Sequence, residues 1–369
     1  MNKILKYVGL DVHKDSITIA IADQGRNGEV RIYGKIPNNL NQIDKFVRKL
    51  TSKNAQLHCV YEAGPCGYIL YRHLTNKGID CAVVAPALIP KKSGDRVKND
   101  RRDATKLATL HRAGELTAVY VPDQEDEAIR DLVRARADFR TALRKVKQQI
   151  NAFLLRHGIC YPGKTKWSKA HRTWLTTIKM AHPAQQIALT EYLDAMENNE
   201  ARVTRITNQL ESFCHTWRLR AVVQALQSMR GISFVSAVTI IAELGDLNRF
   251  DKPTQLMSYL GLVPSEYSTG NSIKKGGITK TGNTHARKAL IESAQAYRLP
   301  ARKSISILKR QQNVPEDVLA VSWDAQLRLC SRYRRLKARG KKHNVVITAI
   351  ARELAGFIWS IVRLVPVAV

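Results

Sequence analysis

The stretch YVGLDVHKDSITIAIAD, residues 7–23, decides how the chain begins to fold. An apolar run holding one acid, Asp11, is followed by a short polar turn and then by small residues alternating with isoleucines. Alternation with a period of two predicts a strand, a tight turn and a second, antiparallel strand. A carboxylate inside an apolar strand is costly to bury unless a cation compensates for it. Asp11 is therefore a candidate metal ligand, and a turn or capping role is the alternative.

A second acid, Glu62, follows the apolar stretch LHCVY where the glycine-rich segment AGPCG interrupts it. A carboxylate at a strand end, ahead of a helix predicted over residues 68–78, is well placed to face a cleft. Residues 79–90 are apolar again and are predicted to contain a further strand.

Two more acids, Asp100 and Asp103, lie three residues apart in KNDRRDATKLA. If a helix starts near Asp100, both carboxylates share one face, with Leu107 and Leu110 continuing toward the core. Two like charges this close favour a shared Mg²⁺, with Mn²⁺ as the alternative ion. The other interpretation is an ordinary acid-rich first turn, which the helix dipole favours.

The order of these four acids is more informative than any one of them. A strand Asp, a strand-end Glu and an Asp pair on a helix fall within one α/β unit of about a hundred residues. This order is typical of ribonuclease-H-like nucleases, in which two metal ions about 4 Å apart activate the attacking oxygen and stabilise the leaving one.

The overall composition points to a polyanionic partner. Lys and Arg number 60 against 31 acidic residues, giving a formal charge of +29, and 44% of the 369 residues are hydrophobic. The chain can thus build real cores and still attract a phosphate backbone. The first strand leaves no room for a signal peptide, and the apolar C-terminal stretch holds Arg363 and Pro366. We therefore expect a cytoplasmic protein with no membrane contact.

The middle of the chain predicts two long helices. Apolar residues recur at helical spacing over residues 125–157 and again over 185–227. With a connector between them, the two segments predict an antiparallel coiled-coil arm. A basic stripe along the first segment faces either a polyanion or solvent, and it comprises Arg130, Arg134, Arg136, Arg140, Arg144, Lys145 and Lys147. In the connector, Trp167 and Trp174 among cations either stack on unpaired bases or pack against the arm.

A third region, residues 229–297, contains several phosphate-binding signals. Gly231 to Gly245 has the spacing of a helical hairpin, whose backbone N–H groups can hold a phosphate. A loop rich in Ser, Thr, Gly and Lys then leads to a helix that we expect Asn283 or Thr284 to cap. Across the chain, the candidate nucleic-acid contacts are Arg101, Arg102, Lys166, Arg172, Lys274, Lys275, Lys280, His285 and Arg287.

The segments GLDVHKD, YEAGPCGY, PALIP, KNDRRDATKLA and GLVPSEYSTG together resemble the insertion sequence one-ten family of transposases, and more closely its one-one-one-one subgroup. The resemblance implies an α/β plus α protein in three parts. They are a RuvC-like domain with an Asp-Glu-Asp-Asp tetrad (1–122), a coiled-coil arm (123–227) and a mainly helical serine transposase domain (228–369). It places the tetrad on Asp11, Glu62, Asp100 and Asp103.

The same resemblance implies an activity: a bridge RNA guides the cutting and rejoining of donor and target DNA, in a homodimer or tetramer. A serine before a glycine would form a covalent 5′-phosphoserine link in a site shared between subunits. Here Thr269 directly precedes Gly270 and Ser268 stands one position earlier. Residue type favours Ser268 and position favours Thr269, so both stay candidates with Ser268 preferred. The alternative function is a metal-dependent junction endonuclease, in which water attacks.

Overall fold

The computed structural model describes residues 4–52, 54–90, 99–270 and 272–366. The chain divides into two compact units, Met1–Val121 and Pro122–Val369.

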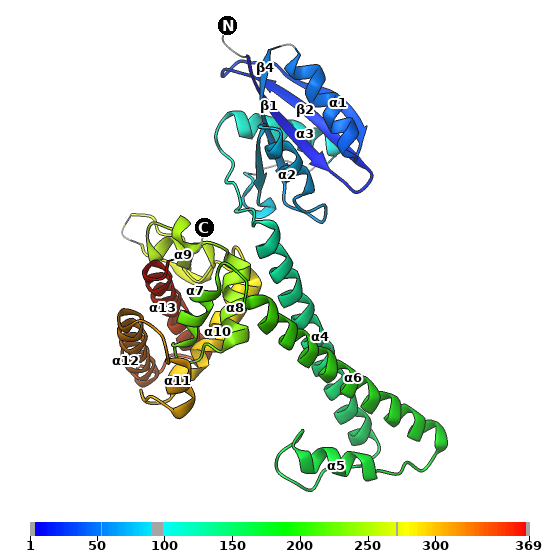
Figure 1. The fold of residues 1–369 in the computed structure, drawn as a ribbon, viewed down its shortest axis with the longest axis vertical. Coiled ribbons are helices and arrows are strands. Elements are labelled where there is room, and N and C mark those ends of the chain that lie inside the picture. Colours follow the sequence, from blue (N-terminus) through cyan, green and yellow to red (C-terminus); the bar gives the residue numbers. More distant parts are fainter. Residues whose placement is uncertain (1–3, 53, 91–98, 271, 367–369) are drawn as a thin grey trace. The chain divides into compact units, whose positions relative to one another are not determined.

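A five-stranded mixed sheet forms the centre of the first unit (Figure 1). Its strands are β1 (Ile4–Val12), β2 (Ser16–Asp23), β3 (Val30–Pro37), β4 (Ala55–Glu62) and β5 (Asp80–Val84). The order across the sheet is β3-β2-β1-β4-β5; β2 is antiparallel to β1 and β3, whereas β4 is parallel to β1 and β5. The predicted strand–turn–strand is confirmed, and the sheet is consistent with the ribonuclease-H-like fold that the resemblance implies.

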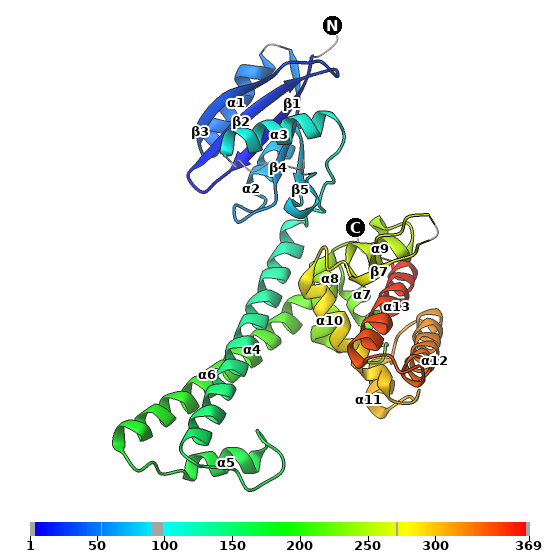
Figure 2. The same cartoon turned by 180° about the vertical axis from the view of Figure 1, so that it is seen from behind.

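Helices cover both faces of this sheet (Figures 1 and 2). On one face, α1 (Leu40–Thr51) and α2 (Ile69–Asn76) bury alternate strand residues such as Leu10 and Tyr61. On the other face, α3 (Asp100–Arg112) packs on small residues of β2. The sheet therefore has two apolar faces, which explains why β1, β2 and β4 read as continuous apolar runs. A short 3₁₀ turn, η1 (Pro86–Leu88), follows β5.

Two long helices begin the second unit, α4 (Gln124–Arg156) and α6 (Pro183–Cys214), with the short α5 (Lys169–Thr177) between them. They pack antiparallel: Arg136 contacts Thr207, and Lys147, further along α4, contacts Glu200, which lies earlier in α6.

The prediction of one helix over residues 185–227 is wrong at its end, because α6 stops at Cys214. The chain leaves the helix there so that Trp217 can enter the core and donate its indole N–H to Asp126 Oδ1, 2.8 Å away. A separate helix, α7 (Arg220–Gln227), follows.

The rest of the second unit is a helical domain with one small hairpin. Its further elements are α8 (Phe234–Leu244), η2 (Leu247–Arg249), α9 (Pro253–Tyr259), β6 (Pro264–Glu266), β7 (Lys275–Ile278), α10 (Thr284–Ala294), η3 (Gln295–Arg298), α11 (Ile305–Arg310), α12 (Glu316–Ala338) and α13 (His343–Leu364). The helical hairpin expected from Gly231 to Gly245 is wrong within these bounds, because this segment holds one helix, α8, which packs against the preceding α7.

The last helix, α13, is long and apolar enough to cross a membrane by length and composition. Nine of its residues, however, are buried in the large core of the second unit against α7, α9, α10 and α12. This burial is that of a core helix, and the docking role expected for the C-terminal apolar stretch fits it.

Candidate functional site

Asp11 is the next-to-last residue of β1 and lies opposite Thr18 in the register of β1 and β2. Its side chain is 17% exposed, on the face of the sheet that α3 covers. The Thr18 hydroxyl is buried and has no hydrogen-bond partner among the described residues. Thr18 in turn pairs with Lys35 of β3, so that Asp11, Thr18 and Lys35 form one row across three strands. This row presents a carboxylate, an unpaired hydroxyl and an ammonium to the same side.

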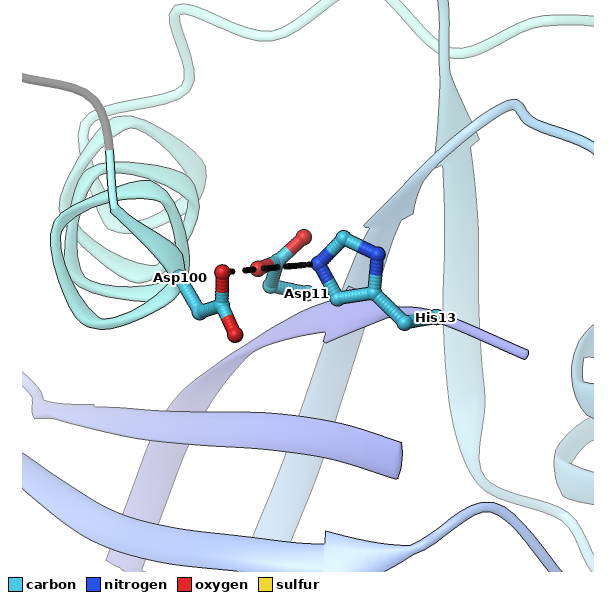
Figure 3. A group of neighbouring side chains, drawn as sticks. All are labelled: Asp11, His13 and Asp100. Carbon is cyan, nitrogen blue, oxygen red and sulfur yellow. Dashed lines mark hydrogen bonds and ion pairs between the residues drawn. The ribbon is translucent and has the colours of Figure 1, made fainter. Parts of the chain in front are cut away.

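Three side chains meet at this end of the sheet (Figure 3). His13 Nε2 lies 3.2 Å from Asp11 Oδ2 and 3.6 Å from Asp100 Oδ1. One ligand atom from each of Asp11, His13 and Asp100 lies within 4.8 Å of the others, and we call this group the acidic cluster. Lys35 Nζ lies 3.3 Å from Asp100 Oδ2, at the edge of the cluster.

Gly9 allows Asp11 of β1 and Asp100 of α3 to lie close together. It shares the α3-facing side of β1 with Asp11, and a Cβ at this position would lie 2.2 Å from the Ala104 carbonyl oxygen of α3. No side chain fits in that space, so only glycine lets the α3 backbone approach β1 this closely. The approach sets the first turn of α3, and with it Asp100, over the end of β1. Asn99 caps that turn by accepting from the Arg102 N–H.

The two carboxylates of the cluster have opposite electrostatic environments. Burial raises the pKa of Asp11, and the charges of Asp100 and Asp103 raise it further against the lowering effect of His13. The hydrogen bond from Lys35 lowers the pKa of Asp100. The charge of Asp11 is thus undercompensated, chiefly because the carboxylate is partly buried, and a bound cation would relieve this.

The other two predicted tetrad members lie near the cluster but outside it. Glu62 is the last residue of β4 and is exposed; because Tyr61 before it packs under α1 and α2, Glu62 faces the α3 side. Asp103 lies one turn after Asp100 and is close enough to raise the pKa of Asp11. Leu107 is buried as expected, whereas Leu110 is only partly buried.

Sequence reasoning missed His13 and Lys35 as members of this site. For His13 a signal existed, because it stands two residues after Asp11, just past the end of β1, where the alternation of the strand would place both side chains on one face. Lys35 carried no such signal, since its position depends on the register of three strands.

The residues present fit a divalent cation. Carboxylate oxygens are preferred ligands of Mg²⁺, and Mn²⁺ also accepts an imidazole nitrogen such as that of His13. The undercompensated carboxylate of Asp11 and the unpaired Thr18 hydroxyl beside it point the same way. The cluster is a candidate metal centre.

The loop that sequence reasoning proposed for phosphate chemistry lies in a β-hairpin of β6 and β7, here called the serine hairpin, of which residues 264–270 and 272–278 are described. Ser268 is exposed, and its Oγ donates to Glu266 Oε1 over 2.7 Å. Thr269 pairs with Ser272 across the tip through two backbone hydrogen bonds, and Gly270 adopts a φ of 54° there. Glu266 faces Lys275 in the register of the hairpin.

The candidate nucleic-acid contacts fall into two groups. Some are exposed: Arg101, Arg102, Lys274, Lys275, Lys280 and His285. The others have internal partners. Lys166 donates to Asn151, Arg172 pairs with Glu200, and Arg287 is buried and donates to the Leu260 and Thr281 carbonyls. Arg287 thus holds together the turn that precedes α10.

A buried carboxylate, Glu243 of α8, joins α4 to α10. Arg134 of α4 donates to both of its oxygens at 2.8 Å, and the Asn283 amide donates at 2.6 Å. Asn283 is also the N-cap of α10, as predicted, because its Oδ1 accepts from the Ala286 N–H. Burial alone would raise the pKa of Glu243, but the bonds from Arg134 and Asn283 hold it below the usual value. We call this group the Glu243 clamp.

Comparisons with known proteins find transposases. Residues 8–159 match a transposase family model of the DEDD type named for IS110, and residues 223–305 match the model described as "Transposase IS116/IS110/IS902 family". The y4qE protein of Sinorhizobium fredii, which carries a transposase name, is 49% identical over 97% of this chain and 88% of its own length. The transposase of insertion sequence IS1533 from Leptospira borgpetersenii is 32% identical over 91% of this chain and 98% of its own. The transposase of IS1111A from Coxiella burnetii is 24% identical over 80% and 78%.

Two matched family models thus cover both the acidic cluster and the serine hairpin, and relatives are similar over nearly the whole chain. This chain belongs to the IS110 family of insertion-sequence transposases, a family whose activity is the cleavage and transfer of DNA.

Proposed function

We propose that this transposase is an RNA-guided recombinase that attaches DNA covalently to Ser268. The observation that carries the proposal is the exposed Ser268 hydroxyl, bonded at 2.7 Å to the Glu266 carboxylate, in a chain that also holds the acidic cluster. An activated nucleophile needs a neighbour that accepts its proton, and Glu266 is in position to do so.

In the proposed step, Ser268 Oγ attacks the phosphorus of a DNA phosphodiester while its proton passes to the Glu266 carboxylate. The new bond is a 5′-phosphoserine link and the broken bond is that between phosphorus and the 3′ oxygen, which takes up the proton from Glu266 and leaves as a free 3′-hydroxyl. A 3′-hydroxyl of a second strand then attacks the phosphoserine and gives its proton to the Glu266 carboxylate, which returns a proton to Ser268 Oγ as the serine leaves. The energy of the phosphodiester is conserved throughout, so no external energy source is required.

Asp11, Glu62, Asp100 and Asp103 are the proposed ligands of Mg²⁺, with Mn²⁺ as the alternative, and His13 is an additional candidate. The ion would neutralise charge that develops on the phosphate oxygens, an effect worth several kcal/mol. Asp11 and Asp100 come from β1 and α3, which Gly9 holds together, so the ligand set is preorganised by packing.

The remaining parts follow the resemblance. The proposed partners are an element-encoded bridge RNA and the donor and target DNA, in a homodimer or tetramer with shared sites. We assign residues 1–122 to the RuvC-like domain, 123–227 to a coiled-coil arm and 228–369 to the serine transposase domain. The antiparallel packing of α4 and α6 supports the arm, and the exposed cations Lys274, Lys275 and Lys280 beside the serine hairpin support phosphate contacts.

A covalent-adduct experiment tests the proposal. The full chain is incubated with its guide RNA, Mg²⁺ and labelled donor and target DNA, and the protein is separated under denaturing conditions. We expect labelled DNA to remain attached in the wild type and in Thr269→Ala, and to be lost in Ser268→Ala. The reverse pattern would move the nucleophile to Thr269.

The same experiment separates covalent from hydrolytic chemistry. Cleavage without any adduct in the wild type would overturn the serine mechanism and favour the junction endonuclease, in which water attacks. Glu266→Gln removes the proton acceptor but keeps the shape, so we expect adduct formation to slow and to recover in part as the pH rises and more hydroxyl ionises.

A further inference from the structure

A cationic cleft opens between α4 and α10 in the second unit. Its volume is about 200 Å³, and helices α6 and α8 complete its walls. Arg136, Arg140 and Arg144 line one side, each four residues after the last and so on one face of α4. His285 and Lys288 of α10 line the opposite side. The two facing walls therefore carry charge of the same sign.

The cleft lacks the carboxylates that its cations need. Three arginines and one lysine face a single acid, Glu292. Within the described residues, no ion pair joins a carboxylate to Arg140, Arg144 or Lys288, and Arg136 donates to the neutral Thr207 hydroxyl at 2.7 Å. Burial, and then the charge of Arg140, lower the pKa of Arg136. Like charges on facing walls repel each other unless an anion lies between them.

The rest of the basic stripe on α4 behaves differently. Arg134 is engaged in the Glu243 clamp, and Arg130 donates to the Ala242 carbonyl at 2.8 Å. Arg130 and Arg134, the first two members of the stripe, thus bind α8. The next three, Arg136, Arg140 and Arg144, line the cleft. The clamp also ties the N-terminus of α10 to α4 through Asn283, so the two cationic walls are fixed relative to each other.

We propose that this cleft binds a phosphate of a nucleic-acid strand between Arg140 and Arg144 on one wall and Lys288 on the other. Arginines four residues apart on a helix rise roughly 6 Å, a spacing comparable to that of neighbouring phosphates in a strand. One guanidinium group can donate two parallel hydrogen bonds to the oxygens of a phosphate. The Ser236 hydroxyl on the α8 wall adds a neutral donor. The proposal deepens the nucleic-acid binding proposed above and does not depend on the serine chemistry.

Neighbouring substitutions of equal charge provide the test. Arg144 lines the cleft, whereas Lys145 beside it is exposed and does not. Binding of labelled single-stranded DNA and of RNA of the same sequence to the full chain is measured over a range of salt concentrations. We expect Arg144→Gln and Lys288→Gln each to weaken binding several-fold and to reduce the salt slope by about 0.7, whereas Lys145→Gln leaves both unchanged.

A double variant sharpens the test. If Arg144 and Lys288 share one phosphate, the Arg144→Gln/Lys288→Gln chain loses less than the sum of the two single losses. Loss on only one of the two strands would identify the source of the phosphate as DNA or RNA. All three substitutions are at exposed side chains, and thermal unfolding checks that the fold is intact.

Three outcomes would overturn the inference. Equal effects of Arg144→Gln and Lys145→Gln would mean that only the overall charge matters. If the wild type binds and all variants bind equally well, the cleft does not bind nucleic acid, and an acidic protein becomes the candidate partner. The proposed function would not be affected by this result. A wild type that binds neither strand would instead defeat the nucleic-acid binding in the proposed function as well.

Discussion

Asp11 in the first unit and Glu243 in the second are both carboxylates on regular secondary structure, and both are largely shielded from water. Glu243 receives bonds from Arg134 and Asn283, and its pKa is lowered. Among the residues that the structure describes, the Asp11 carboxylate is hydrogen-bonded only to the imidazole of His13; Asp100 and Asp103 lie nearby, and the pKa of Asp11 is raised. One carboxylate is fully compensated by its own chain and the other is not.

This difference separates a structural acid from one that is kept for a ligand. A buried carboxylate costs several kcal/mol unless cations and donors surround it. The helix junction at Glu243 provides them, whereas Asp11 at the end of β1 has the imidazole of His13 and two further acids nearby. Undercompensated charge of this kind is a sign of a functional site when geometry supports it.

Asp11→Asn gives the largest expected effect. We expect DNA cleavage to fall by at least about 100-fold, because a metal ligand is lost and the ion contributes several kcal/mol. The free energy of unfolding should stay the same or rise, since repulsion from Asp100 and Asp103 disappears. Asp15→Asn, at an exposed acid in the same hairpin turn, is the control. A strong loss of stability in Asp11→Asn would assign Asp11 to the structural class.

Glu243→Gln should lower the stability of the fold, in contrast to Asp11→Asn. We expect it to reduce the free energy of unfolding by about 2 to 3 kcal/mol, because Arg134 and Asn283 lose a charged acceptor. The cost is below that of a fully buried pair since the Arg134 side chain is 44% exposed. Chemical denaturation measures it, with Glu191→Gln on the surface of α6 as the control. A neutral result would show that the clamp adds no stability.

Gly9→Ala tests how the cluster is held together. The added Cβ would collide with the α3 backbone, and we expect a loss of about 1 to 3 kcal/mol with a further loss of cleavage as Asp100 moves away from Asp11. Gly277→Ala is the matched control for stability, because a Cβ there meets nothing within 4 Å. Equal stability of the two variants would mean that α3 can shift without cost.

The smallest effect is in the pH dependence of stability. Because the folded pKa of Asp11 is above its usual value near 3.8, wild type loses stability relative to Asp11→Asn as the pH rises through that window. Because the pKa of Glu243 is below its usual 4.5, wild type loses stability relative to Glu243→Gln as the pH falls below that value. Unfolding from pH 3 to 6 should give difference curves of opposite sign, and curves of the same sign would contradict the comparison.

Local patterns were sufficient to predict much of the first unit. Period-two alternation gave the hairpin around Asp11, and residue spacing gave the start of α3 at Asp100. The cap at Asn283 was predictable for the same reason, since an N-cap depends on residues within one turn.

Features that depend on distant residues could not be predicted. The end of α6 is set by the bond from Trp217 to Asp126, which is 91 residues away in the chain. Lys35 reaches Asp100 only through strand register, and Arg287 is buried only because the Leu260 and Thr281 carbonyls face it. The cationic cleft likewise exists only once α4 and α10 have come together.

Helix α13 has a consequence for the order of events during synthesis. Helices α7, α9, α10 and α12, against which it packs, all precede it in the chain. The large core of the second unit therefore cannot close until α13 has left the ribosome, and until then the apolar surfaces that it covers stay accessible to water. The helical domain that carries the serine hairpin can therefore complete its core only after α13 has been synthesised. None of the residues assigned to chemistry lies in α13.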